Sequence, residues 1–175
     1  SFYTNGAGTF ATYSHSNANG EQCAGVSISS EGTNVQVLQT GILLEPNRLY
    51  RLAFSAYSSA GHNLAVFLQK HTAPYTSYGL NNWVVDLTPG WQSFEKTFTT
   101  TGFVGATTDA RLRFWLAPYD AAGDRFFLDD VWLAKAGSGK ERTGVEPPPA
   151  FALHQNFPNP FNPVTKIQFS LANPA

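Results

Sequence analysis

Short apolar-alternating segments separated by turn-forming residues most limit the fold of this 175-residue chain. Nine such segments are rich in Val, Leu, Phe, Tyr and Thr, and Gly, Pro, Asn and Ser lie between them. They span residues 8–13, 22–29, 34–44, 48–57, 63–70, 81–87, 91–100, 110–117 and 125–134. No stretch keeps the apolar spacing of an amphipathic helix. We therefore predict an all-β fold, a two-sheet β-sandwich of the jelly-roll type.

Composition divides the chain into three parts. Residues 1–136 hold the strand-like segments and form the predicted β-sandwich domain. Residues 137–149 are rich in Gly and Ser, carry charges and end in a triple proline, which is typical of a linker that is semi-rigid at its prolines. Residues 150–175 are dense in Asn-Pro, and the alternation within 164–171 predicts one short C-terminal β segment.

Few charges accompany many aromatic rings in this sequence. Lys and Arg total 11, Asp and Glu total 12, and the formal net charge is −1. The chain therefore offers no broad basic field for nucleic acid or anionic lipid. Its apolar runs are far shorter than the roughly 20 residues of a membrane-spanning helix. Cys23 is the sole cysteine, which excludes a disulfide framework and a cysteine-based metal site.

Alternation within the predicted strands separates core positions from surface positions. In segments 50–57, 64–69 and 111–117, we expect the even-numbered side chains to face the core. The outward positions of interest are Tyr57, Phe67, Gln69, Arg111, Arg113 and Trp115. An indole on a polar sheet face exposes apolar area that a monomer normally covers. Trp115 therefore marks either a binding surface or a position beneath a long loop.

Four segments, in this order and spacing, resemble the jelly-roll carbohydrate-binding modules of families 4, 9, 16 and 22. They are LYRLAFSAY, PYTSYGL, WQSFEKTFTT and RLRFWLAPYDAAGDRFFLDDVWL, and the resemblance covers roughly residues 2–135. It implies a module without catalytic activity that holds a soluble or amorphous polysaccharide in a concave aromatic cleft. Sugar C–H faces pack on aromatic planes, and sugar hydroxyls bond Arg and amide groups. A neutral glycan also suits a net charge near zero.

The resemblance further implies where the sugar binds. Trp115 takes a cleft position on a strand, and Arg111 and Arg113 share its face. Tyr75 and Tyr78 lie in the predicted loop before Gly79, where the family often places an aromatic clamp. Further candidates are Gln36, Tyr57, Gln69 and Trp83. Packing beneath the 75–82 loop is the alternative for Trp83.

A structural Ca²⁺ is a further implication of the resemblance, with Asp129 of FLDDVWL as a ligand. Alternation places Asp129 toward the core, where a carboxylate needs a cation or several hydrogen bonds. The family opens with a strand that usually supplies a second, glutamate ligand. The segment SFYTNGAGTF resembles the stretch after that strand. We therefore expect the first strand to be missing, the metal site to be incomplete and a sheet edge to be open.

The tail FALHQNFPNPFNPVTKIQFSLANP resembles the start of the C-terminal sorting domain of the type nine secretion system. This resemblance implies export by the type nine secretion machinery and an extracellular or outer cell-surface location. An unpaired Cys23 is then expected to be buried and inert. Family members run longer, so we expect the sorting domain to be partial.

Two other classes of function stay open. An enzyme is not expected, because no two carboxylates fall on the predicted cleft face and no HExxH, G-x-S-x-G or P-loop motif is present. A lyase built on Tyr75 and His71 is the enzymatic alternative. The structural alternative is an extracellular filament, in which segment 164–171 of one chain adds as a strand to the open edge of the next.

Overall fold

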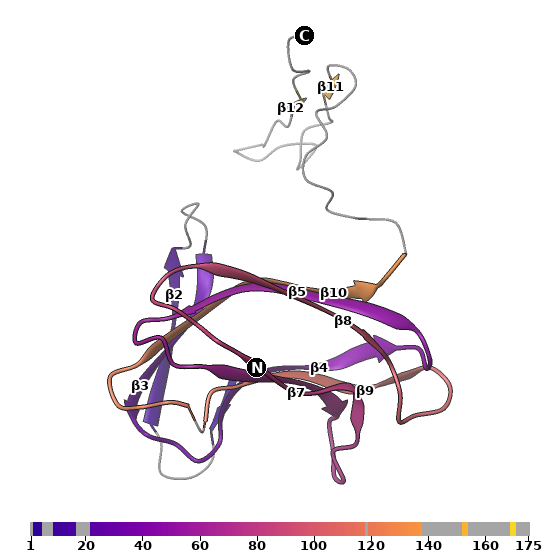
Figure 1. The fold of residues 1–175 in the computed structure, drawn as a ribbon, viewed down its shortest axis with the longest axis horizontal. Coiled ribbons are helices and arrows are strands. Elements are labelled where there is room, and N and C mark those ends of the chain that lie inside the picture. Colours follow the sequence, from indigo (N-terminus) through magenta and orange to yellow (C-terminus); the bar gives the residue numbers. More distant parts are fainter. Residues whose placement is uncertain are drawn as a thin grey trace, which may run out of the picture. The chain divides into compact units, whose positions relative to one another are not determined.

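The structure is a computed structural model that describes residues 2–4, 9–16, 22–117, 119–137, 152–153 and 169–170. The chain forms two compact units, residues 1–138 and residues 139–175. None of the described residues lies in a helix, and they therefore contain no helix that could cross a membrane. The first unit is a sandwich of two layers (Figure 1). The predicted all-β, two-sheet fold is confirmed.

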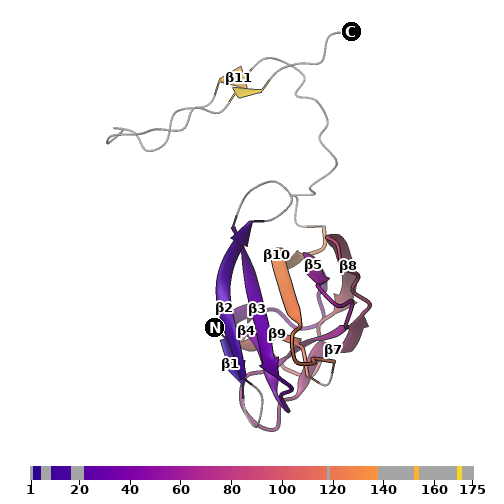
Figure 2. The same ribbon diagram turned by 90° about the vertical axis from the view of Figure 1, so that its left-hand side faces the viewer.

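Each layer is a five-stranded antiparallel sheet. The β9 sheet has the order β1 (Phe2–Thr4), β4 (Val35–Leu44), β9 (Thr107–Trp115), β6 (Leu64–Lys70) and β7 (Ser77–Val85). The β5 sheet has the order β2 (Thr9–Ser16), β3 (Gln22–Ser30), β10 (Arg125–Lys135), β5 (Leu49–Ser58) and β8 (Gln92–Thr99). β4, β7 and β9 lie in the lower layer of Figure 1 and β5, β8 and β10 in the upper layer. Figure 2 shows β2 and β3 side by side as one long hairpin.

The core lies between the two sheets and follows the predicted alternation. Leu52 and Phe54 of β5 are buried there, as are Val66 of β6 and Leu112 and Phe114 of β9. The rings of Phe54 and Phe114 meet edge to face, with centroids 5.0 Å apart. Because each strand buries alternate side chains, the residues between them must point away from the core. This parity fixes which side chains the outer face of the β9 sheet presents.

The strand bounds differ from the sequence prediction by up to four residues, and one short strand of the first unit is additional. β1 was not predicted, and β7 begins at Ser77 instead of residue 81. Tyr78 and Gly79 therefore lie in a strand, not in a loop. Gly79 has φ 108°, and a Cβ atom there would lie 2.2 Å from the carbonyl oxygen of Thr99. Only glycine allows β7 to pass this close to the end of β8.

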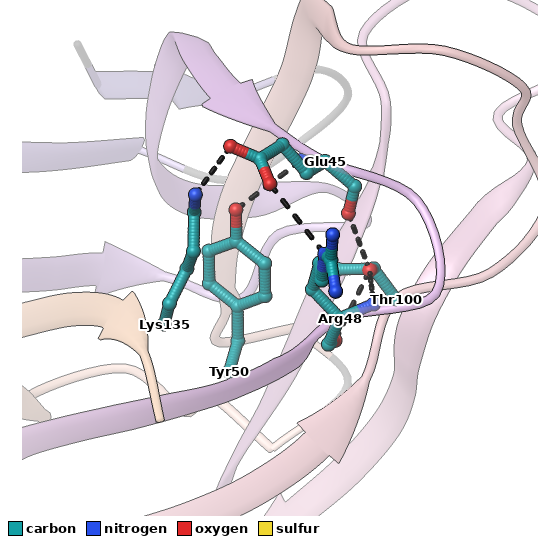
Figure 3. A network of polar contacts seen from close by, with 5 residues as sticks. All are labelled: Glu45, Arg48, Tyr50, Thr100 and Lys135. Atoms are coloured by element: carbon teal, nitrogen blue, oxygen red, sulfur yellow. Dashed lines mark hydrogen bonds and ion pairs between the residues drawn. The ribbon is translucent and has the colours of Figure 1, made fainter. Parts of the chain in front are cut away.

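A network of polar contacts fixes the turn between β4 and β5 (Figure 3). The buried Thr100 hydroxyl donates to the Glu45 carbonyl at 2.6 Å and accepts from the Arg48 N–H at 3.0 Å. The Tyr50 hydroxyl accepts from the Glu45 N–H at 3.2 Å. The Glu45 carboxylate pairs with Lys135 of β10 and with Arg48. The bond from Lys135 lowers the pKa of Glu45. The network thus joins the turn to both β8 and β10.

The second unit contains one described strand pair. β11 (Ala152–Leu153) and β12 (Phe169–Ser170) are antiparallel. Of the predicted β segment 164–171 only Phe169 and Ser170 are described, and residues 138–149 of the predicted linker lie outside the described residues. The sorting domain and strand donation between subunits stay predictions.

Candidate functional site

Nine side-chain positions form a regular grid on the outer face of the β9 sheet. β9 lies in the middle, and the strand register sets its three outward residues opposite partners on β4 and β6. Directly opposite residues on neighbouring strands lie about 5 Å apart at Cβ and point to the same side. The three rows are Gln36–Trp115–Ala65, Leu38–Arg113–Phe67 and Thr40–Arg111–Gln69. We call these nine residues the Arg–aromatic face.

Stacked rings and guanidinium groups hold the middle of this face together. The Arg113 guanidinium lies 4.2 Å from the ring centroid of Phe67 and 4.9 Å from that of Trp115. The Phe67 and Trp115 rings meet at 62° with centroids 5.8 Å apart. Phe67 is buried beneath these two partners, whereas Arg113 and Trp115 are half-buried. Arg113 is therefore held on two aromatic surfaces with its N–H edges left for other partners.

Tyr75 extends the face beyond the end of β6. Its ring centroid lies 4.9 Å from the Arg111 guanidinium, and its side chain is 52% exposed. The residue has φ 55°, and its N–H donates to the Thr72 carbonyl at 2.9 Å. The loop thus presents an aromatic ring to solvent at the Arg111 end, while Trp115 marks the other end. Side chains two apart on a strand are about 7 Å apart, so the face is long enough to contact several linked sugar rings.

Polar atoms without partners gather on the Arg–aromatic face. Among the described residues, five buried side-chain polar atoms have no hydrogen-bond partner, and four of them belong to this face. They are Gln36 Oε1, Arg111 Nε, Arg113 Nε and Trp115 Nε1. The fifth is Arg51 Nε on β5. Buried polar groups in native proteins are nearly always bonded, so this cluster favours a polar partner at the face, either water or a ligand.

The two arginines are also desolvated. Burial, with a smaller contribution from the charge of Arg111, lowers the pKa of Arg113 to about 10. Burial lowers the pKa of Arg111 as well, and Tyr75 opposes this shift. Among the described residues no carboxylate is at ion-pair distance from either guanidinium, whereas Arg48 and Arg51 pair with Glu45 and Glu95. The face therefore carries two positive charges without an internal counter-ion.

Six of the predicted binding residues are brought together and three are not. Gln36, Gln69, Arg111, Arg113 and Trp115 lie on the Arg–aromatic face, and Tyr75 contacts it. The other three are Tyr57, Tyr78 and Trp83, and each is placed elsewhere by its strand. Strand alternation and the resemblance to the family predicted the six residues that lie together, because β4, β6 and β9 alternate regularly where five of them lie.

Tyr78 and Trp83 face the core side of β7, so neither side chain lies on the Arg–aromatic face with the other predicted binding residues. Tyr78 is 3% exposed, packs against Phe103 and donates to Asp109 at 2.8 Å. This burial, with the Asp109 bond, raises the pKa of Tyr78 to about 12. Trp83 meets Phe54 edge to face at 5.6 Å. The alternative of a packing role for Trp83 fits this placement.

Tyr57 lies on the other sheet, where it points outward from β5. Its ring stacks on Phe127 with centroids 4.3 Å apart and meets Trp91 at 4.8 Å. The outward parity predicted for Tyr57 is confirmed, but its face is that of the β5 sheet. Tyr57 is therefore separated from Trp115 by the whole sandwich.

Asp129 does not have the predicted core orientation. It pairs in register with the outward Ser55, is half-buried, and accepts the N–H of Asp130 at 2.8 Å. Among the described residues, no group of three or more His, Cys, Asp or Glu side chains gathers to hold a metal ion. Asp129 belongs to no such group among the described residues, and the predicted Ca²⁺ stays a prediction that no step below uses.

Sequence reasoning missed two supporting residues of the face. Phe67 of β6 lies beneath Arg113, and Leu38 of β4 lies opposite Arg113 on the other side. The alternation of β6 indicated that Phe67 points outward, but its position opposite Arg113 depends on the register between β6 and β9, which the sequence pattern does not give. His71, the partner of Tyr75 in the lyase alternative, is exposed, and no hydrogen bond joins the two side chains.

Comparisons with known proteins identify the family of the larger part of the chain. A family model described as a carbohydrate binding domain, of families 4 and 9, matches residues 1–121. A solved structure titled for the structure and function of a family 4 module is 22% identical with a TM-score of 0.57, covering 72% of this chain and 94% of the other. The N-terminal cellulose-binding domain of β-1,4-glucanase C from Cellulomonas fimi is 23% identical, covering 74% of this chain and 95% of its own, with a TM-score of 0.55.

A more distant structure has the same fold. The xylan-binding domain from Paenibacillus barcinonensis is 12% identical with a TM-score of 0.51, covering 79% of this chain and 87% of that domain. No curated protein matches the chain.

Proposed function

Because this chain belongs to the carbohydrate binding domain family, we propose that it binds a polysaccharide chain along its Arg–aromatic face. The observation that carries the placement is the grid on β4, β9 and β6, with four unpartnered polar atoms beside stacked aromatic rings. Two similar solved domains are named for binding cellulose and xylan, which supports a polysaccharide as the partner. The domain would then direct the protein that carries it to a glycan.

The chemistry of binding follows from the two kinds of side chain on this face. Trp115 and the exposed Tyr75 offer ring faces to sugar C–H groups at opposite ends of the face. Arg111 and Arg113 donate to sugar oxygens, and Gln36 Oε1 accepts from a hydroxyl. A hydroxyl can both donate and accept, so one sugar edge can satisfy Gln36 Oε1 and the neighbouring Trp115 Nε1 together. Ligand binding would thereby remove unmet hydrogen bonds already present in the protein.

Binding without catalysis is part of the proposal. Glycoside hydrolysis needs two carboxyl groups across the scissile bond, and the nine residues of the Arg–aromatic face include none. Asp109, the nearest acid along β9, accepts from the hydroxyls of Thr107 and Tyr78 at 2.7 and 2.8 Å. These bonds lower the pKa of Asp109, so it stays ionised and unsuited to act as a general acid.

Affinity electrophoresis tests the proposal directly. The full chain would be run through gels containing laminarin, xylan, mannan or soluble cellulose, and we expect retardation by at least one glycan. Trp115→Ala should abolish that retardation. Trp132→Ala is the matched control, since Trp132 is 39% exposed on the β5 sheet, away from this face. Equal retardation of Trp115→Ala and the parent would place the binding site elsewhere.

The same approach tests the physical form of the glycan. A face that contacts one chain through both ring stacking and edge hydrogen bonds should accept soluble or amorphous polysaccharide. A crystalline surface hides the edges of its chains. Pull-down on crystalline cellulose should therefore recover little protein, and strong recovery would contradict this form of binding.

Export is the other part of the proposal, and it rests on the tail alone. The resemblance of residues 151–174 to a type nine sorting domain supports an extracellular or outer cell-surface location. Fractionation of cells with and without a working type nine secretion system would test it. We expect the protein outside intact cells only when the secretion system works. Export from both kinds of cell would overturn the assignment of the tail to this secretion system.

A further inference from the structure

The Arg–aromatic face carries a charge arrangement that a neutral sugar does not account for. Arg111 and Arg113 lie two residues apart on β9, so both guanidinium groups lie on one side of one strand. Both are half-buried, and neither is at ion-pair distance from a carboxylate among the described residues. By contrast, the Arg51 guanidinium on β5 lies 2.5 Å from Glu95. Among the described residues, Arg111 and Arg113 are therefore two half-buried cations on one sheet face that form no ion pair.

Such an arrangement is unfavourable in the unbound protein. The charge of Arg111 acts unfavourably on Arg113, and burial removes part of the hydration of both groups. The lowered pKa values of both groups report this cost, since desolvation is the first cause in each. Stacking on Phe67, Trp115 and Tyr75 engages the flat faces of the guanidinium groups. Their N–H edges remain, and Nε of each lacks a partner.

Resting on the proposed function, we propose that the polysaccharide bound at this face is anionic, with its carboxylate or sulfate groups seated against Arg111 and Arg113. A planar carboxylate accepts two parallel N–H bonds from one guanidinium, and a sulfate offers the same fork. Charge-assisted bonds of this kind are about twice as strong as neutral ones. An anionic sugar would also offset the repulsion between the two arginines, which no hydroxyl does.

The geometry sets how such a chain would lie. Trp115 flanks Arg113, and Tyr75 flanks Arg111, so an aromatic ring stands at each end of the charged pair. A chain running along β9 would stack its sugar rings at the two ends and place acidic groups at the centre. An acidic group on more than one sugar of the run would engage both arginines. The fitting ligand class is thus a polyuronate or a sulfated glycan.

Matched pairs of glycans test this inference. Polygalacturonate, alginate and a sulfated galactan would each be compared in affinity gels with its methyl-esterified, carboxyl-reduced or desulfated counterpart. We expect at least one charged polymer to bind about 10-fold or more tightly than its uncharged partner, the ratio that one charge-assisted bond supports. That binding should weaken with added salt. Preference for the sulfated member over the uronates would assign the anion as sulfate.

Variants separate the charge from the fold. Arg113→Gln and Arg111→Gln should each weaken binding of the charged polymer about 10-fold, while Arg125→Gln should change it less than about twofold. Arg125 is the control because it loses the same charge on an exposed site of the β5 sheet. Thermal unfolding of each variant would verify that it folds. Because the two arginines are changed in separate variants, the test still works if one of these variants does not fold.

The outcomes distinguish the two proposals. Tighter binding of the charged polymer, sensitive to salt and to both face arginines, supports the inference. Binding of neutral glycans that depends on Trp115, with no preference for the charged partner, overturns the inference and leaves the proposed function intact. No binding to any charged or neutral glycan overturns both.

Discussion

Phe67 and Arg113 are expected to stabilise each other, and this coupling can be measured without a ligand. The Arg113 guanidinium lies 4.2 Å from the Phe67 ring centroid, inside the roughly 6 Å limit of a cation–π contact. Phe67→Leu keeps an apolar side chain in this buried position but removes the ring. Arg113→Met keeps the apolar stem but removes the charge. The two single variants and the double variant form a thermodynamic cycle.

The expected coupling follows from burial. A cation–π contact stabilises by about 0.5–1 kcal/mol when exposed and by about 2 kcal/mol when desolvated. Arg113 is half-buried and its pKa falls to about 10 through burial, so a coupling of about 1–1.5 kcal/mol is expected. The sign of the coupling is also predicted. Arg113→Met should lower the free energy of unfolding less in the Phe67→Leu variant than in the parent protein. In that variant the charge remains desolvated but has lost one of its two rings.

Urea unfolding followed by tryptophan fluorescence gives the four free energies of unfolding. The control cycle pairs Phe67→Leu with Arg51→Met, because Arg51 lies on the other sheet and shares no contact with Phe67. Distant sites are additive within about 0.3–0.5 kcal/mol. A coupling between Phe67 and Arg113 no larger than the control would refute the idea that the ring holds the guanidinium in place for binding.

Three further predictions concern the frame of the site. Thr100→Val should lower the free energy of unfolding by about 2 kcal/mol, since two partly buried backbone groups lose their hydroxyl partner, while Thr100→Ser should cost about 1 kcal/mol in urea titrations. Gly79→Ala should lower the melting temperature sharply, because its Cβ would lie 2.2 Å from the Thr99 oxygen, whereas alanine at Gly90, which has open space, should not. The phenol of Tyr78 has a raised pKa of about 12 against 10 unfolded, so its stabilising contribution is complete below pH 10 and lost between pH 10 and 12. Tyr78→Phe should remove that part of the alkaline loss, and an identical pH profile in parent and variant would show that Tyr78 is not the group concerned.

The regular strands were predictable from sequence because alternation is their dominant physical signal. β5, β6, residues 35–40 of β4 and residues 111–115 of β9 keep a regular alternation across the core, and every second side chain must be apolar to fill it. Once this parity is known, Arg111, Arg113 and Trp115 must share a face. Neighbour relations between strands were less accessible, since the sheet order and register come from contacts distant in sequence. The stacking of Phe67 under Arg113 is a property of register and could not be read from β6 or β9 alone.

The wrong placements arise where alternation breaks. β10 carries a register shift between Asp129 and Trp132, and Asp130 has φ 51° there. A bulge of this kind changes which side later residues face, so a parity count across it misassigns them. Tyr78 was misplaced for another reason: β7 extends back to Ser77, and the segment before Gly79 was taken for a loop. Both errors concern local backbone geometry that apolar patterning does not encode.

Net charge and local charge give different answers about the ligand, and the local one governs binding. The total of −1 sums 11 basic and 12 acidic residues over the chain, and it suits a neutral glycan. At 0.15 M salt, however, exposed charges interact only within about 8 Å, so a ligand on β9 responds mainly to the groups beside it. There it meets Arg111 and Arg113, whose burial limits screening and whose neighbours on the face supply no carboxylate. Composition therefore predicts no partner that needs a broad basic field, such as a nucleic acid. It does not exclude an acidic sugar chain that needs only two well-placed guanidinium groups.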